Sequence, residues 1–290
     1  MIQSKSATLS STTINYLSVE SKHKDRSLLF LHGFPETSWS WEFYLNYFAD
    51  KYNLYAPDLP GYNFSPGLGE AKNYTIENLV NVLNEFIETC CAQKPIHVIA
   101  HDWGGVLAWP LAAFYATNIA SLTILNAAHP SCFTREMLSN ERQQQASSYI
   151  STLVSDNGFD ATSKNQHQML KGFYGKCFNH LSKQQQQSFV KQWQHKKSME
   201  NAFSYYKNMP SQSQSNVERA IKIPRVYIKV PTMVLWGMKD TAFVHEVLNG
   251  MEQWIDNLQI EIFDDDDHWL HHRRLNEVAS KIDSFVSVTG

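Results

Sequence analysis

The sequence predicts an α/β protein in which a mostly parallel sheet is flanked by helices and interrupted by an inserted helical segment. Three observations lead to this prediction. Short apolar runs alternate with helix-like sequence up to about residue 131, the alternation then stops, and it resumes near residue 223. With 290 residues, of which 43% are hydrophobic, the chain is long enough to bury a sizeable core around such a sheet.

Strands are expected where a short apolar run is followed by turn or cap residues. Five runs have the length and residue types of buried strands, namely 27–31, 52–56, 96–100, 121–125 and 232–236. A helix is predicted over 76–91, where apolar residues recur at helical spacing behind Thr75. A strand-like alternating segment precedes His268, and a final helix is predicted over 277–286.

The segment between the two halves of the pattern differs in composition. It is rich in Gln, Ser, Asn and Lys, yet large apolar side chains recur in it too often for a disordered linker. We therefore expect a core domain made of residues 1–132 and 226–290, with a helical cap of residues 133–225 inserted in it.

Composition and charge restrict the partners. A net charge of −3, from 25 basic and 28 acidic residues, creates no field that attracts nucleic acid or an anionic membrane. The longest apolar stretch, 106–116, is too short to cross a bilayer, and no targeting segment is evident. We expect a cytoplasmic protein that acts on a small uncharged organic substrate and water. The oligomeric state stays open, with a homo-oligomer among the alternatives.

Cysteine and histidine patterns predict no metal, and the chemistry set out below needs no cofactor. The four cysteines lack metal-ligand spacing and are expected to be free thiols. Among the twelve histidines there is no HExxH pattern. His271 and His272 are predicted to lie on the surface, and the acidic run 264–267 is predicted to be a solvated strand end.

The stretch VIAHDWGG at 98–105 runs from a predicted buried strand through small residues into a predicted helix. Its form, small-x-nucleophile-x-small, is typical of a sharp strand-to-helix turn that exposes one side chain above a sheet. That side chain is Asp102. An ordinary helix N-cap would explain an isolated Asp equally well, so further elements are needed.

Three further elements occur in the chain order that this arrangement requires. The segment HGFPE at 32–36 follows a predicted strand, where a loop supplies a backbone N–H to an oxyanion hole. Asp240 follows the strand after the insertion and is placed to orient a histidine. His268 follows the last strand-like segment and is the best placed histidine for this partnership.

With these motifs the sequence resembles the epoxide hydrolase and haloalkane dehalogenase branch of the α/β-hydrolases, over nearly the whole chain. The matching segments are HGFPE, DLPGY, HDWGG, LNAAHP, WGMKD and DHW. The resemblance implies an Asp102 nucleophile with His268 and Asp240, and two cap tyrosines that hydrogen-bond an epoxide oxygen. These tyrosines map to Tyr206, in FSYYKNM, and to Tyr149, in ASSYISTL.

Because a carboxylate is ionised at neutral pH and attacks sp³ carbon, Asp102 favours epoxide opening through an ester over acyl transfer. His268 is expected to activate the water that hydrolyses this ester, and the N–H groups of Phe34 and Trp103 to stabilise the oxyanion. Two alternatives stay open: a haloalkane dehalogenase with the same chemistry, and a non-catalytic ligand-binding protein of the same fold.

Overall fold

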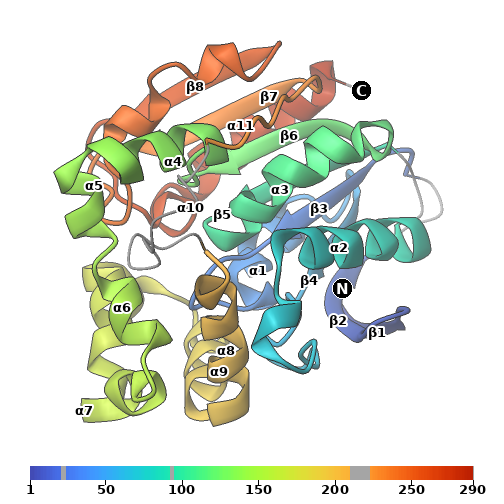
Figure 1. Cartoon of the computed structure of the whole chain (residues 1–290). Coiled ribbons are helices and arrows are strands. Elements are labelled where there is room, and N and C mark those ends of the chain that lie inside the picture. Colours follow the sequence, from blue (N-terminus) through green and yellow to red (C-terminus); the bar gives the residue numbers. More distant parts are fainter. Residues whose placement is uncertain (21–23, 92–94, 210–222, 290) are drawn as a thin grey trace.

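The structure, a computed structural model, describes residues 1–20, 24–91, 95–209 and 223–289. Within these ranges one sheet of eight strands forms the centre of the protein (Figure 1), in the spatial order β1-β2-β4-β3-β5-β6-β7-β8. The strands are β1 (Gln3–Thr8), β2 (Thr13–Val19), β3 (Ser27–Leu31), β4 (Asn53–Pro57), β5 (Ile96–His101), β6 (Ile119–Leu125), β7 (Thr232–Gly237) and β8 (Leu258–Phe263).

The sheet is mostly parallel, as predicted. Strands β3 to β8 pair in parallel with their neighbours, whereas β1 with β2 and β2 with β4 pair antiparallel. Strands β3, β4, β5 and β7 are buried along their whole length, which is why they appear in the sequence as continuous apolar runs. The first two strands were not predicted, because β1 lies at the sheet edge and is largely exposed.

Helices cover both faces of the sheet and also form the insertion. The α-helices are α1 (Glu42–Tyr47), α2 (Ile76–Cys90), α3 (Trp103–Phe114), α4 (Pro130–Ser139), α5 (Glu141–Ala146), α6 (Tyr149–Val154), α7 (Gly158–Tyr174), α8 (Lys183–Gln194), α9 (Lys196–Lys207), α10 (Leu270–Arg273) and α11 (Leu275–Val288). Short 3₁₀ helices are η1 (Ser38–Trp41), η2 (Ala71–Asn73), η3 (Ala116–Asn118), η4 (Gly175–His180), η6 (His245–Leu248) and η7 (Met251–Gln253).

Two apolar clusters fill the space between the sheet and its helices. One contains the buried side chains of α2 and α3, together with those of the inserted helices. The other lies beneath α1 and α11 on the opposite face. Helix α2 begins as predicted at Thr75, whose side chain accepts a hydrogen bond from the backbone N–H of Asn78.

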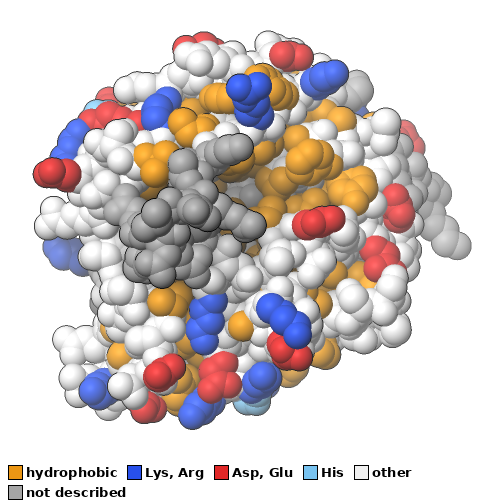
Figure 2. All heavy atoms as spheres, viewed as in Figure 1, with side chains coloured by type: hydrophobic (Ala, Val, Ile, Leu, Met, Phe, Trp, Pro, Cys, Tyr) orange, Lys and Arg blue, Asp and Glu red, His pale blue; other side chains and the backbone are white. Residues whose placement is uncertain are grey.

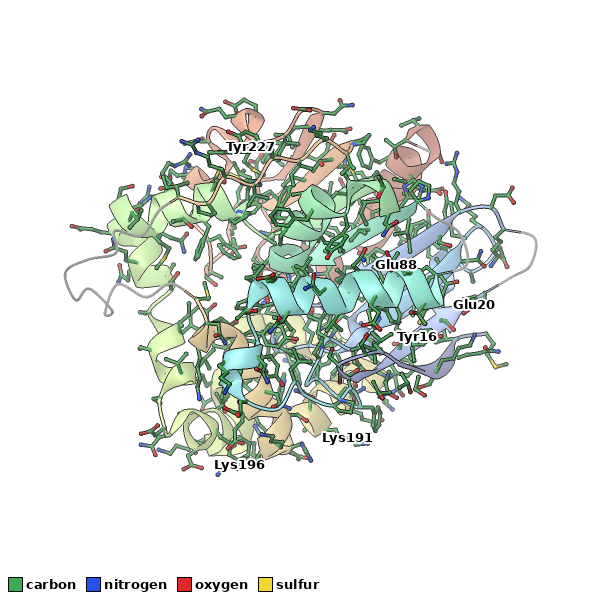
Figure 3. The ribbon with its side chains drawn as sticks, turned by 45° about the vertical axis from the view of Figure 1, so that its right-hand side comes forward. Tyr16, Glu20, Glu88, Lys191, Lys196 and Tyr227 are labelled. Carbon is green, nitrogen blue, oxygen red and sulfur yellow. The ribbon has the colours of Figure 1, made fainter. Side chains whose placement is uncertain are left out.

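The inserted helices α6 to α9 contact the loops at the carboxyl ends of the strands. In three hydrogen bonds, Trp193 of α8 donates to the carbonyl of Pro35 at 2.7 Å, Tyr205 of α9 donates to Pro60 at 2.8 Å, and Trp269 donates to Phe173 of α7 at 2.7 Å. Figure 3 labels Lys191 of α8. Its Nζ atom lies 4.4 Å from the ring centre of Phe64, in the loop after β4. The boundaries of the predicted cap stay a prediction, and its residues 210–222 lie outside the described residues.

The surface in Figure 2 mixes charges, with Lys and Arg side chains interspersed among Asp and Glu on the described part of this face. Cys90, Cys91, Cys132 and Cys177 are free thiols, as predicted. Among the helices of the described residues, none has both the length and the apolar character needed to span a membrane.

Candidate active site

Asp102 lies at the turn between β5 and α3. Its backbone has φ 48° and ψ −121°, a conformation that L-residues rarely adopt outside constrained turns. The turn needs small residues, because a Cβ atom on Gly104 would lie 2.3 Å from the carbonyl oxygen of Leu31 and one on Gly105 would lie 2.3 Å from Cβ of Ala127. The close packing of α3 against β3 and the end of β6 therefore holds Asp102 above the sheet.

The loop after β3 presses against this aspartate. The backbone N–H of Phe34 donates to Oδ1 of Asp102 at 2.7 Å. A Cβ atom on Gly33 would lie 2.4 Å from Cβ of Asp102, so only glycine allows this approach. Trp103 is the first residue of α3, so its N–H has no acceptor within the helix. The structure thus places one predicted oxyanion donor, the Phe34 N–H, on the carboxylate, and leaves the Trp103 N–H at the start of α3 without a partner in the helix.

His268 lies between β8 and α10 and is buried beside two carboxylates. Its Nδ1 donates to Oδ2 of Asp240 at 2.8 Å, and its Nε2 is 3.6 Å from Oδ2 of Asp102. Burial lowers the pKa of His268, but the charge of Asp240 and the contacts with both carboxylates outweigh it and raise the pKa to about 10. In this state the imidazole is protonated.

Asp240 follows β7 and is held by four donors. Its Oδ1 accepts the backbone N–H groups of Ala242 at 2.7 Å and Phe243 at 3.0 Å, and its Oδ2 accepts from His268 and, at 2.7 Å, from the side-chain amide of Asn126. Asn126 also exchanges hydrogen bonds with the backbone of Gly237. Asn126 therefore supports the acid, a role that the sequence pattern did not indicate.

The two predicted tyrosines come from the insertion and meet over Asp102. Tyr149 begins α6 and Tyr206 lies in α9, and their ring centres are 6.2 Å apart. They share with Asp102 and His268 a cavity of about 230 Å³, whose lining residues are Phe34, Asp102, Ala146, Tyr149, Phe173, Tyr206, Thr241, Ala242, His268 and Trp269. Its other lining residues carry no charge at neutral pH.

Burial and neighbouring groups shift the pKa values of the two tyrosines and of Asp102 in different directions. Burial and the charge of Asp102 raise the pKa of Tyr149, whereas a hydrogen bond with Tyr206 lowers it. The pKa of Tyr206 is raised well above its usual value, first by burial. Burial also raises the pKa of Asp102, but His268, His101 and the Phe34 N–H together bring it below its usual value. The cavity therefore combines an ionised carboxylate with two protonated hydroxyls.

The prediction of surface histidines is wrong, whereas the prediction of a solvated acidic run is wrong for Asp266 and right for Asp264 and Asp265, which are exposed. His271 and His272 are buried, because α10 packs against the loop after β3 and both rings bond to the buried carboxylate of Glu36. In the acidic run, Asp266 is buried and pairs with Arg273 and Arg274. Within the described residues, Glu36, His271 and His272 also bring three possible metal-ligand atoms within 4.8 Å of one another.

Comparison with known proteins shows the family of the chain. Residues 26–274 match the family model described as alpha/beta hydrolase fold. The chain is 29% identical to epoxide hydrolase 3 of Xenopus tropicalis over 274 residues, which is 89% of this chain and 71% of that protein.

Solved structures of epoxide hydrolases are also similar to this chain. An epoxide hydrolase from Bacillus megaterium in complex with an inhibitor superimposes with a TM-score of 0.88 at 25% identity, over 98% of this chain and 100% of that chain. A mutant of that enzyme with its product, a naphthyloxypropanediol, superimposes with a TM-score of 0.87, at the same identity and the same coverage of both chains. The chain belongs to the alpha/beta hydrolase fold family and is a hydrolase related to the epoxide hydrolases.

Proposed function

We propose that this protein hydrolyses an epoxide to a vicinal diol through a covalent ester on Asp102. The observation that carries the proposal is the shared cavity, where an ionised carboxylate and a histidine face two tyrosine hydroxyls. A carboxylate nucleophile serves attack at sp³ carbon, and paired hydroxyl donors serve a departing oxygen that stays tethered to the substrate.

In the first step a carboxylate oxygen of Asp102 forms a bond to one ring carbon of the epoxide. The bond between that carbon and the ring oxygen breaks, and its electron pair stays on the oxygen. Tyr149 or Tyr206 donates a proton to this oxygen, while the other hydroxyl hydrogen-bonds it. The turn between β5 and α3 holds the carboxylate in position for the attack.

In the second step water attacks the carbonyl carbon of the ester. Ester formation removes the negative charge of Asp102, one of the charges that raise the pKa of His268. The pKa of His268 then falls, and the imidazole passes its proton to the tyrosinate that the first step left, so that it becomes a neutral base for the attacking water. The N–H groups of Phe34 and Trp103 stabilise the oxyanion. As it collapses, the bond to the substrate oxygen breaks and that oxygen takes a proton from His268 to complete the diol. The carboxyl group of Asp102 then returns its proton to His268, which restores the starting state.

The cavity supports a small neutral substrate. An apolar cavity of about 150 Å³ holds one benzene molecule. A cavity of about 230 Å³ lined by Phe34, Phe173 and Trp269 therefore suits a single aromatic ring with a short epoxide side chain. The aryl-ether diol bound by the Bacillus megaterium variant is a product of comparable chemistry.

A panel of epoxides and haloalkanes, with diol and halide both measured, tests the proposal. We expect diol from uncharged aryl epoxides and no halide release. The haloalkane alternative needs an indole N–H that binds halide beside the nucleophile, whereas the Trp103 ring packs edge-on against Tyr206, with the ring centres 5.0 Å apart. Halide release without diol would establish the dehalogenase, and absence of both products would favour a ligand-binding role.

A further inference from the structure

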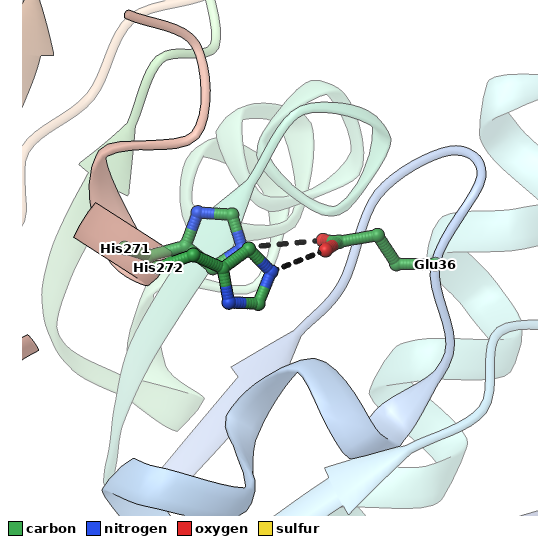
Figure 4. A group of neighbouring side chains, drawn as sticks. All are labelled: Glu36, His271 and His272. Atoms are coloured by element: carbon green, nitrogen blue, oxygen red, sulfur yellow. Dashed lines mark hydrogen bonds and ion pairs between the residues drawn. The ribbon is translucent and has the colours of Figure 1, made fainter. Parts of the chain in front are cut away.

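A cluster of histidines surrounds one buried carboxylate beneath the candidate active site. Glu36 has no solvent exposure, and its carboxylate accepts hydrogen bonds from Nε2 of His271 at 3.2 Å and from Nε2 of His272 at 2.6 Å (Figure 4). A third imidazole, His101, has its Nδ1 3.4 Å from the same carboxylate and its Nε2 2.9 Å from the carbonyl oxygen of His268.

The cluster joins two segments that carry different parts of the site. Glu36 lies two residues after Phe34, whose N–H bonds Asp102, and the turn between them is closed by a hydrogen bond from the N–H of Glu36 to the carbonyl of Gly33 at 3.0 Å. His271 and His272 lie in α10, directly after His268. Glu36 therefore connects the loop of an oxyanion donor to the helix that follows the catalytic histidine.

Among the described residues, imidazoles of α10 bond the buried carboxylate of Glu36 and so connect the loop after β3 to that helix. The ion partners of Glu36 among the described residues are the imidazoles of His101, His271 and His272. Burial raises the pKa of Glu36, but His271 and His272 hold it well below its usual value, so Glu36 is ionised.

Hydrogen bonds describe the cluster better than a metal ion does. Since an ionised carboxylate only accepts, the Nε2 atoms of His271 and His272 must carry hydrogen. Ligands about 2.0 to 2.1 Å from a tetrahedral zinc ion lie roughly 3.3 Å from one another. The 2.6 Å contact between Glu36 and His272 is shorter than this and has the length of a charge-assisted hydrogen bond.

We propose that Glu36, His271 and His272 form a positioning clamp that holds His268 in register with the Phe34 N–H and thereby accelerates hydrolysis of the Asp102 ester. This inference rests on the proposed function. Ester hydrolysis needs the base and the oxyanion donor at the same carbon. Ester formation instead depends on Asp102 and on tyrosines from the insertion.

The test compares two substitutions of one donor. His272→Met removes the N–H and keeps an apolar side chain of similar length, whereas His272→Gln keeps an amide N–H that reaches the same acceptor. Rapid mixing with an epoxide, acid quench and intact mass spectrometry give the rates of ester formation and ester hydrolysis separately. Because a misplacement of about 1 Å costs about 10²-fold, we expect His272→Met to hydrolyse the ester at least about 10-fold more slowly, with ester formation within about twofold of the parent. His272→Gln should restore most of the hydrolysis rate.

The matched control is His97→Met, at the other end of β5. His97 is also buried and bonds the hydroxyl of Ser121 at 2.8 Å, so its loss tests the general cost of removing a buried histidine. We expect lower stability and an unchanged ratio of the two rates. If His272→Met does not fold, Glu36→Gln takes its place in the test. It sets an amide group against an N–H donor, and we expect the same selective loss of ester hydrolysis.

Several results would overturn the clamp. Parent-like hydrolysis in His272→Met, equal slowing of both steps, or failure of His272→Gln to differ from His272→Met would each show that the donor does not position His268. One equivalent of transition metal in the purified protein, found by elemental analysis, would also replace the hydrogen-bonded clamp. If the parent forms no ester with any epoxide, the proposed function fails instead.

Discussion

Nε2 of His268 lies 3.6 Å from Oδ2 of Asp102, a separation that is longer than a hydrogen bond yet keeps the imidazole beside the carbon that water must attack. Its Nδ1 is meanwhile held by Asp240. This geometry is why we propose Asp102 for the first half of the reaction and His268 for the second.

His268→Gln should form the ester and fail to hydrolyse it. Loss of a general base slows the step it serves by about 10² to 10⁴-fold, so the adduct should accumulate. Intact mass spectrometry should show the added mass, and peptide mapping should place it on Asp102. The exposed His245 provides the control, since His245→Gln should leave no adduct. A modified residue other than Asp102 would reassign the nucleophile.

Asp240→Asn should slow ester hydrolysis by about 10²-fold or more, because an amide stabilises the wrong tautomer of His268. Single-turnover kinetics with the ester formed in place would measure this. The exposed Asp256 gives a control of the same chemical change, and Asp256→Asn should hydrolyse the ester normally. Parent-like hydrolysis in Asp240→Asn would mean that another group orients the histidine.

Tyr149→Phe and Tyr206→Phe should each slow ester formation by about 10²-fold, as expected for loss of one positioned proton donor, and the double change should nearly abolish it. Pre-steady-state measurement of the ester decides this. Tyr205→Phe is the matched control, because Tyr205 adjoins Tyr206 but its hydroxyl bonds Pro60 away from the cavity. Unchanged epoxide opening in the double variant would exclude a ring-opening role for the tyrosines.

Stability should fall as the pH falls from about 6.5 towards 4. Burial lowers the pKa of His32, His97 and His129 from 6.5 to about 4, so the unfolded chain binds protons in this range that the native protein does not. Each histidine adds a slope of up to about 1.4 kcal/mol per pH unit. Urea unfolding across this range should show the slope, and His97→Gln should reduce it. A flat profile would show that these imidazoles are protonated in the native state.

His268 has the opposite effect. Its pKa is raised from 6.5 to about 10, so the stability it contributes is complete below pH 6.5 and is lost as the pH rises through 10. His268→Gln should therefore flatten the alkaline side of the stability profile, which the same unfolding measurements would detect.

Local sequence by itself determined the strand-turn-helix unit around Asp102. A buried strand, a turn of small residues and the start of a helix depend on neighbours along the chain, so the apolar run and the two glycines were enough to predict them. The same holds for the loop of Phe34, which directly follows a predicted strand. The edge strand β1 lacks such a run, because most of its side chains face solvent.

Only the tertiary structure decided what surrounds these elements. The Asn126 amide meets Asp240 across 114 residues of chain, and Glu36 meets His272 across 236. In the sequence, Asn126 is a neutral amide that could not itself be the acid of the site. His271 and His272 appear there as polar residues ahead of a terminal helix. Whether a polar side chain is solvated or bonded inside the protein depends on which distant segment packs against it, and no local pattern contains that information.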